Sequence, residues 1–266
     1  MTQPVLAASE YGGPFEVPPI GDLFNFRPIV EIGGGLLDIN RVVLITLTSM
    51  LITMGLFYLA FSKPKVVPGK LQTAAEAVVG FIRDSVAVDI IGPEGRRYAP
   101  FLTSLFMFIW LNNLFEIIPG VSFPATSKIA LPMFLAVVVW LTFIILGMRT
   151  QGPISYFKEL IIPPGVPKVM LVLIAPIEFI SNIVVRPITL TVRLFANMVA
   201  GHILLTIVFL AINSFLVLGP GLPVGIVVLL VSPLAVGFEL FVGLLQAYIF
   251  VILTSVYISG SLHPAH

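Results

Sequence analysis

The sequence predicts an all-α protein that crosses a membrane several times. Of its 266 residues, 58% are hydrophobic and only 10% are charged, and the mean hydropathy is +1.09. A soluble domain of this length would carry about 25% charged residues. There is no cysteine, which excludes a disulfide framework, a thiolate metal site and a thiol nucleophile. We therefore expect five transmembrane helices, the last two long and strongly tilted, together with one amphipathic helix in the membrane plane.

Three segments have the length of a single crossing, since about 20 apolar residues span about 30 Å of hydrocarbon as a helix. Only Glu116 interrupts them. The three predicted crossings are 42–61, 98–118 and 129–148.

Two much longer apolar segments follow, at 169–218 and 224–259, divided by a Gly-Pro-Gly-Leu-Pro turn. As helices they would be about 75 and about 54 Å long, which is too long to stand upright in a bilayer. They must tilt or bend, and the prolines at which a bend is expected are Pro176, Pro187 and Pro233.

The connecting segments predict the orientation. Segment 71–91 mixes apolar residues with Glu76 and Arg83, seven apart on one helical face, and is predicted to lie in the membrane plane. Six Lys or Arg residues lie in 62–97 and three more in 149–168, whereas the opposite loops hold few. By the positive-inside rule the N-terminus is outside and the C-terminus cytoplasmic. We expect residues 1–41 to form an extracytoplasmic region without a signal peptide, and residues 42–266 to form one transmembrane domain.

Arg193 is the most informative residue, because it falls near the middle of the fourth predicted crossing. Its guanidinium cannot lose its proton and costs several kcal/mol to place there. An arginine that reaches back to the interface is the alternative, and that interpretation suits Arg186 better. Asn197 lies one turn beyond Arg193 on the same face, where it either serves the same site or only packs through a hydrogen bond between helices.

His202 lies nine residues beyond Arg193 and faces away from it. Glu239 and Gln246, seven apart, share a face of the last helix, and Glu239 is expected at the depth of His202. An imidazole and a carboxylate at matched depth suggest a proton path from the outer side. A satisfied buried histidine remains the alternative. Glu116 would extend that path to the surface, or is simply a solvated carboxylate.

Several signatures are missing from the sequence. It has no P-loop for a nucleotide, no His-Glu-x-x-His for zinc and no pair of intramembrane histidines for haem. No inverted repeat supports a common transporter design. We predict neither a cofactor nor a metal.

The segment from Arg193 to His202 reads RLFANMVAGH and resembles the Arg-Leu-Phe-Gly-Asn-x-x-Ala-Gly motif of F-type ATP synthase subunit a. The segment 245–254, LQAYIFVILT, is similar to the block on that family's last helix, and 113–119, NLFEIIP, to its Asn-Leu-x-Asp/Glu-x-x-Pro element. PATS at 124–127 resembles the Pro-Thr-Ser that follows. Together these blocks cover 98–259, while the first 40 residues match no family motif.

Two positions depart from the family pattern. Ala196 replaces the commoner glycine. His202 stands where many bacterial relatives have Glu and Glu239 where they have His, so the pair looks exchanged, as in mitochondrial forms.

The resemblance implies a subunit that is not catalytic by itself. It would offer two offset proton half-channels to a rotating c-ring, separated by the charge of Arg193, and would bind b-type stalk subunits and lipid, but no nucleic acid or nucleotide. A bacterial plasma membrane is expected, with an organellar inner membrane as the alternative. An imidazole path suits protons better than sodium. Two other functions remain open: a channel or secondary transporter with an arginine counter-ion, and a purely structural anchor.

Overall fold

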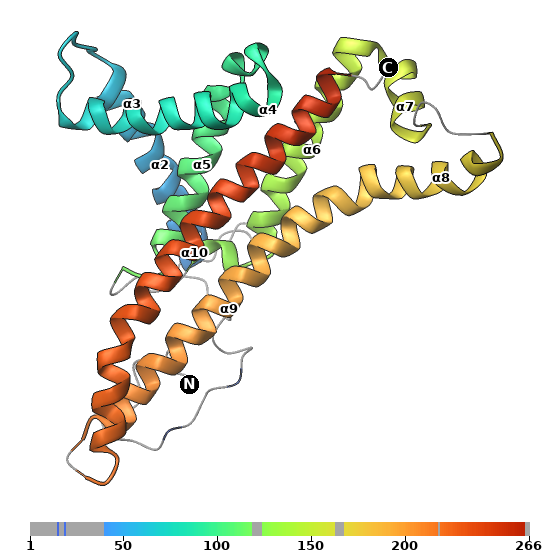
Figure 1. Cartoon of the computed structure of the whole chain (residues 1–266). Coiled ribbons are helices and arrows are strands. Elements are labelled where there is room, and N and C mark those ends of the chain that lie inside the picture. The colour runs from blue at the N-terminus through green and yellow to red at the C-terminus, as the bar shows by residue number, and fades with distance from the viewer. Residues whose placement is uncertain are drawn as a thin grey trace. The chain divides into compact units, whose positions relative to one another are not determined.

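The computed structural model describes Phe15, Pro19 and residues 40–118, 124–162, 168–217 and 219–263, and within these ranges all regular structure is helical. This confirms the predicted all-α class for the part described, while region 1–41 lies almost wholly outside it. Figure 1 shows the order of the helices. They are α2 (Arg41–Phe61), α3 (Lys70–Ile82), α4 (Asp89–Ile91), α5 (Ala99–Leu114), α6 (Ala130–Gln151), α7 (Pro153–Ile161), α8 (Lys168–Ile180), α9 (Arg186–Phe215) and α10 (Leu222–Leu262).

Four helical stretches in the described residues are long and apolar enough to cross a membrane: α2, α6, the continuous run Met170–Phe215 and α10. Helix α5 is apolar but has only 16 residues. It ends before the predicted residue 118 because the chain tightens into i→i+3 bonds, from Glu116 N to the Asn113 carbonyl and from Ile117 N to the Leu114 carbonyl, both 3.1 Å. The count of five crossings and the tilt of the last two remain predictions.

The first long segment is not a uniform α-helix. Between α8 and α9 the chain forms a π-helical segment, Ser181–Val185, which ends two residues before Pro187. Proline lacks an N–H, and its ring would clash with the carbonyl four residues earlier, so a widened turn just before it relieves both problems. Pro176 and Pro233 lie inside α8 and α10 without a change of helix type.

Two Gly-Pro steps separate short helices from their neighbours. Gly92 (φ +96°) ends α4 and Pro93 begins a 3₁₀ turn, while Gly152 (φ +84°) ends α6 and Pro153 begins α7. Glycine tolerates the positive φ, and proline suits a first helical position. The sequence predicts only a connecting segment at 149–168 and does not predict α7, because nine residues are too few to show a clear helical period.

The described chain forms two compact units. The first contains Met1–Thr48, Asn112–Lys128 and Phe195–Leu245, and the second Ser49–Leu111, Ile129–Leu194 and Gln246–His266. In the first unit, the start of α10 lies so close to the end of α9 that a Cβ at Gly225 would be 2.6 Å from the Leu216 nitrogen. The first turn of α10 is therefore packed directly against the last turn of α9.

In the second unit, side-chain hydrogen bonds connect the end of α10 to two other helices. Ser259 Oγ donates to the Ile90 carbonyl on α4 at 2.9 Å, and Gln151 Nε2 at the end of α6 donates to the Ser261 carbonyl at 3.3 Å. The last turns of α10 are therefore fixed from two sides.

Candidate functional site

Three ionisable side chains are buried together in the first unit. Glu116 lies in the turn after α5, His202 on α9 and Glu239 on α10, with exposed fractions of 4%, 7% and 4%. Buried charges in an apolar surrounding are costly unless they are paired or exchange protons. These three residues are among those that the sequence predicted, and the structure brings them into one cluster.

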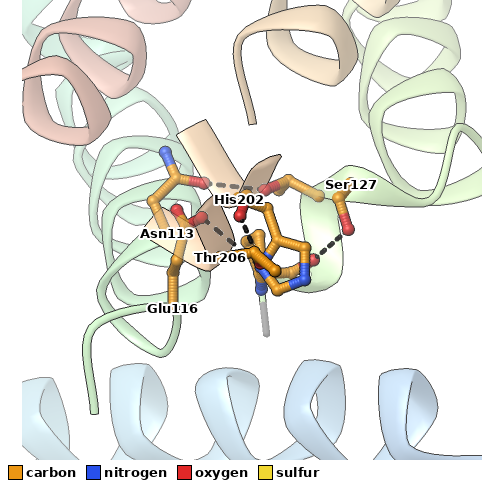
Figure 2. Close-up of polar contacts among 7 residues, drawn as sticks. Asn113, Glu116, Ser127, His202 and Thr206 are labelled. Carbon is orange, nitrogen blue, oxygen red and sulfur yellow. Dashed lines mark hydrogen bonds and ion pairs between the residues drawn. The ribbon is translucent and has the colours of Figure 1, made fainter. Parts of the chain in front are cut away.

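Glu116 and His202 face each other in this cluster. Glu116 Oε1 lies 3.7 Å from His202 Nδ1, as Figure 2 shows. This separation is too long for a direct hydrogen bond and short enough for strong electrostatic coupling. Thr206 lies one turn further along α9, and its Oγ1 donates a hydrogen bond to the His202 carbonyl at 2.7 Å. The contact is an ion pair only when His202 is protonated and Glu116 is ionised at the same time.

Glu239 reaches the same cluster from α10 because α9 has a glycine opposite it. A Cβ added at Gly201 would overlap the Glu239 carboxylate. The charge of Glu239 also acts on Glu116. Glu239 Oε1 is buried and has no hydrogen-bond partner within the described residues. A carboxylate in this condition is able to accept or release a proton without first breaking a bond inside the chain.

A second set of polar residues supports the cluster. Asn113, near the end of α5, donates from Nδ2 to the Gly243 carbonyl of α10 at 3.0 Å. Its Oδ1 accepts a 2.8 Å hydrogen bond from Thr126 Oγ1 in the 3₁₀ turn Ala125–Ser127. Figure 2 shows Asn113 beside the Glu116 and His202 contact. Three segments far apart in sequence thus meet at one amide.

The two arginines of the fourth predicted crossing, Arg186 and Arg193, lie in the second unit and differ in their contacts. Arg186 is half-buried, and its guanidinium carbon lies 4.9 Å from the ring centroid of Tyr257 and 6.0 Å from that of Phe143. Arg193 is exposed, and its guanidinium makes no hydrogen bond, ion pair or ring contact with any residue that the structure describes. It is thus presented outward from an apolar helix.

The remaining two predicted site residues are half-buried. Asn197, on α9, has a buried Nδ2 without a hydrogen-bond partner in the described ranges. Gln246 lies on α10 and belongs to the second unit, as Arg193 does, whereas Asn197 belongs to the first. Their roles in a site stay predictions.

Sequence reasoning did not assign a site role to Asn113, Thr126, Gly201 or Gly243. The paired Asn112 and Asn113 in an apolar crossing were a usable signal, because a polar side chain at such a position must find a partner. No comparable signal marks Gly201 and Gly243. Their role depends on which residue of another helix lies against each glycine, and this is known only from the structure. No group of three or more His, Asp or Glu side chains in the described ranges is arranged to hold a metal ion.

Fold and site together define a class: a helical membrane protein that crosses the bilayer several times and carries ionisable groups within its apolar helices. Comparison with known proteins narrows this class. Residues 43–259 match the family described as ATP synthase A chain. ATP synthase subunit a of Frankia alni is 41% identical over 269 residues, covering 99% of this chain and 90% of the relative. The protein of the same name from Streptomyces lividans is 43% identical over 249 residues, with 91% and 86% covered, and that of Rhodococcus erythropolis is 38% identical over 261 residues, with 97% and 93% covered.

The chain belongs to the ATP synthase A chain family, whose members are known as ATP synthase subunit a. The family resemblance seen in the sequence motifs is confirmed. The apolar helices and the bacterial relatives make this a bacterial membrane protein of the ATP synthase membrane sector.

Proposed function

We propose that this chain conducts protons between two offset half-channels and a rotating c-ring, so that proton flow drives rotation and ATP synthesis. It is the non-catalytic stator subunit, held by b-type stalk subunits. It lies in the bacterial plasma membrane with its N-terminus outside and its C-terminus in the cytoplasm. The observation that carries the proposal is the guanidinium of Arg193, exposed on an apolar helix and without an ion-pair partner among the described residues.

The physical argument starts from the cost of that guanidinium. An arginine at mid-membrane costs several kcal/mol unless an acid or water stabilises it, and the described chain offers Arg193 no acid. We infer that the acid that meets Arg193 belongs to another subunit. A ring of subunits that each carry a membrane-embedded carboxylate supplies it, because such a carboxylate is neutral in lipid and ionises only beside a cation or water.

The buried cluster provides the other half of the mechanism. Protons enter from the outer side past Glu116, His202 and Glu239, whose contact and burial suit stepwise transfer. Each proton loads one ring carboxylate, travels round with the ring and leaves on the cytoplasmic side. Arg193 keeps the two half-channels apart. Asn197 on α9 and Gln246 on α10 contribute further polar groups to the path. Each charge supplies about 2.3 kcal/mol per 100 mV, so several must pass per ATP.

The test uses the whole ATP synthase reconstituted in liposomes. We expect Arg193→Ala to abolish proton-driven ATP synthesis and to make the membrane sector leak protons, because nothing then stops direct transfer between the half-channels. Arg97→Ala is the matched control, since it removes an exposed arginine from the 3₁₀ turn between α4 and α5. Normal coupled synthesis in Arg193→Ala would contradict the proposal.

The coupling ion is tested on the unaltered complex. A pH gradient should drive synthesis in sodium-free buffer, because an imidazole transfers protons and does not bind Na⁺ well. Synthesis driven by a sodium gradient at equal pH would refute a proton path. Ion flux through the isolated chain without a ring would instead support a channel or transporter.

A further inference from the structure

We propose that Asn113 is a positioning residue that sets the distance between the two carboxylates of the buried cluster. The proposal rests on the proposed function, because it assigns Asn113 an effect on proton entry through Glu116 and Glu239. It comes from three hydrogen bonds made by Asn113, each to a different segment of the first unit.

The first bond fixes the segment that carries Glu116. The Asn113 backbone carbonyl accepts the Glu116 N–H at 3.1 Å, in the turn that follows the end of α5 at Leu114. The direction in which the Glu116 side chain leaves the chain therefore depends on where Asn113 lies. That side chain is the one whose Oε1 lies 3.7 Å from His202 Nδ1.

The second bond fixes the helix that carries Glu239. Asn113 Nδ2 donates to the carbonyl of Gly243, one helical turn beyond Glu239, where side chains face the same side. A Cβ at Gly243 would lie 3.2 Å from Asn113 Cβ, so the contact is close only because this residue is glycine. A movement of Asn113 thus displaces the two carboxylates relative to each other.

The third bond fixes the amide itself. Thr126 Oγ1 donates to Asn113 Oδ1 at 2.8 Å, which leaves Nδ2 free to donate to the Gly243 carbonyl. Asn113 is 4% exposed and Thr126 is fully buried, so water does not replace either bond easily. All of these residues belong to the first unit.

A role in proton entry follows from the coupling between the charges that face the cluster. These groups are Glu116, His202, Glu239 and, from the start of α2, Arg41, whose charge acts on His202. Electrostatic coupling inside a protein falls steeply with distance. A change in separation between the carboxylates therefore changes the outer pH at which the cluster takes up protons.

The experiment measures the initial rate of proton-driven ATP synthesis by the whole complex in liposomes, as a function of pH in the compartment that supplies protons. The rate is normalised to the amount of this chain in the complex. We expect Asn113→Ala to lower the normalised rate about three- to tenfold, the effect of losing a buried hydrogen bond on a rate. The pH of half-maximal rate should move as well.

Thr126 offers a matched pair of variants. Thr126→Val keeps the shape but removes the hydroxyl, and should shift the pH profile in the same direction as Asn113→Ala, but less. Thr126→Ser keeps the hydroxyl and should restore the normal profile. If Asn113→Ala lowers the rate only in proportion to the amount of chain, with an unchanged pH profile, Asn113 is merely structural and the inference is wrong.

Glu239→Gln separates this inference from the function on which it rests. It should slow synthesis, and adding Asn113→Ala to it should cause little further loss, because both changes act on one path. Multiplying losses in the double variant would overturn the inference alone. Normal synthesis in Glu239→Gln would overturn the proposed function, and the inference with it.

Discussion

Arg186 and Arg193 lie on the same helix, two turns apart, yet only one has its charge satisfied within the described chain. Arg186 contacts the faces of Tyr257 and Phe143, rings from α10 and α6. Arg193 is exposed and unpaired among the described residues. A guanidinium over aromatic rings stabilises the fold. A bare guanidinium on an apolar helix destabilises the isolated chain, so its value must come from what meets it outside. We therefore expect Arg186 to contribute to stability, and we propose that Arg193 contributes to function.

The largest expected effect is a loss of activity without a loss of protein. Arg193→Ala should reduce proton-driven ATP synthesis by about a hundredfold or more, since it removes the charge that a moving carboxylate requires. The amount of the chain in purified complex should stay normal, because no described contact is lost. Activity assays together with quantitative immunoblots check both. A chain that disappears from the complex would show that Arg193 is structural after all.

The next largest effect is expected inside the buried cluster. Gly201→Ala places a methyl group where the Glu239 carboxylate lies, so that side chain must move, and synthesis should fall about tenfold. Gly237→Ala is the matched control on α10, because a Cβ there meets nothing within 4 Å. Rates should be measured on equal amounts of complex. Equal activity of the two variants would show that the placement of Glu239 does not limit proton entry.

Arg186 should behave in the opposite way from Arg193. Arg186→Ala removes the ring contacts and should cost about 1 kcal/mol of stability, seen as a lower thermal midpoint of the solubilised chain. Tyr257→Leu should cost a similar amount, whereas Tyr257→Phe, which keeps an aromatic face, should cost less. Synthesis per folded complex should change little in all three. A full loss of synthesis in stable Arg186→Ala would erase the distinction between the two arginines.

The smallest effect is expected for a third arginine, which is fully exposed. Arg83 contacts Asp84 through two 2.8 Å bonds, Nε to Oδ1 and Nη2 to Oδ2. The hydrogen bond from Arg83 lowers the pKa of Asp84. The pKa of Asp84 is lower in the folded chain than in the unfolded chain. The pair therefore stabilises the folded chain at a pH above the ordinary pKa range of aspartate, and this stabilisation is lost as the pH falls through the lowered pKa. Water and salt screen such surface pairs.

This pair is tested by titration of Asp84. Its carboxyl chemical shift should titrate at higher pH in Arg83→Gln than in the natural chain. Asp84→Asn should leave stability and synthesis unchanged. A measurable loss of synthesis in Asp84→Asn would mean that the exposed Arg83–Asp84 pair also takes part in function.

The helical fold was predictable because long apolar segments of the sequence identify membrane helices. Long apolar runs predicted α2, α6, the continuous run from α8 to α9 and α10 within a few residues, since lipid leaves the backbone no better way to satisfy its hydrogen bonds. Helix ends were predicted less well. Helix α5 stops at Leu114 and a π-helical segment precedes Pro187, because local hydrogen bonding and a proline ring decide such details.

The sequence alone determined the class of protein and identified its few charged residues within apolar segments. Long apolar segments predict membrane helices, and a charge inside such a helix costs so much free energy that it indicates a special role. Tertiary structure alone decided which polar groups meet. The contact of Glu116 with His202, the glycine opposite Glu239 and the amide of Asn113 between three segments depend on helices far apart in the chain lying together. The reason is that a helical period shows which face a residue occupies, but not which neighbour that face will find.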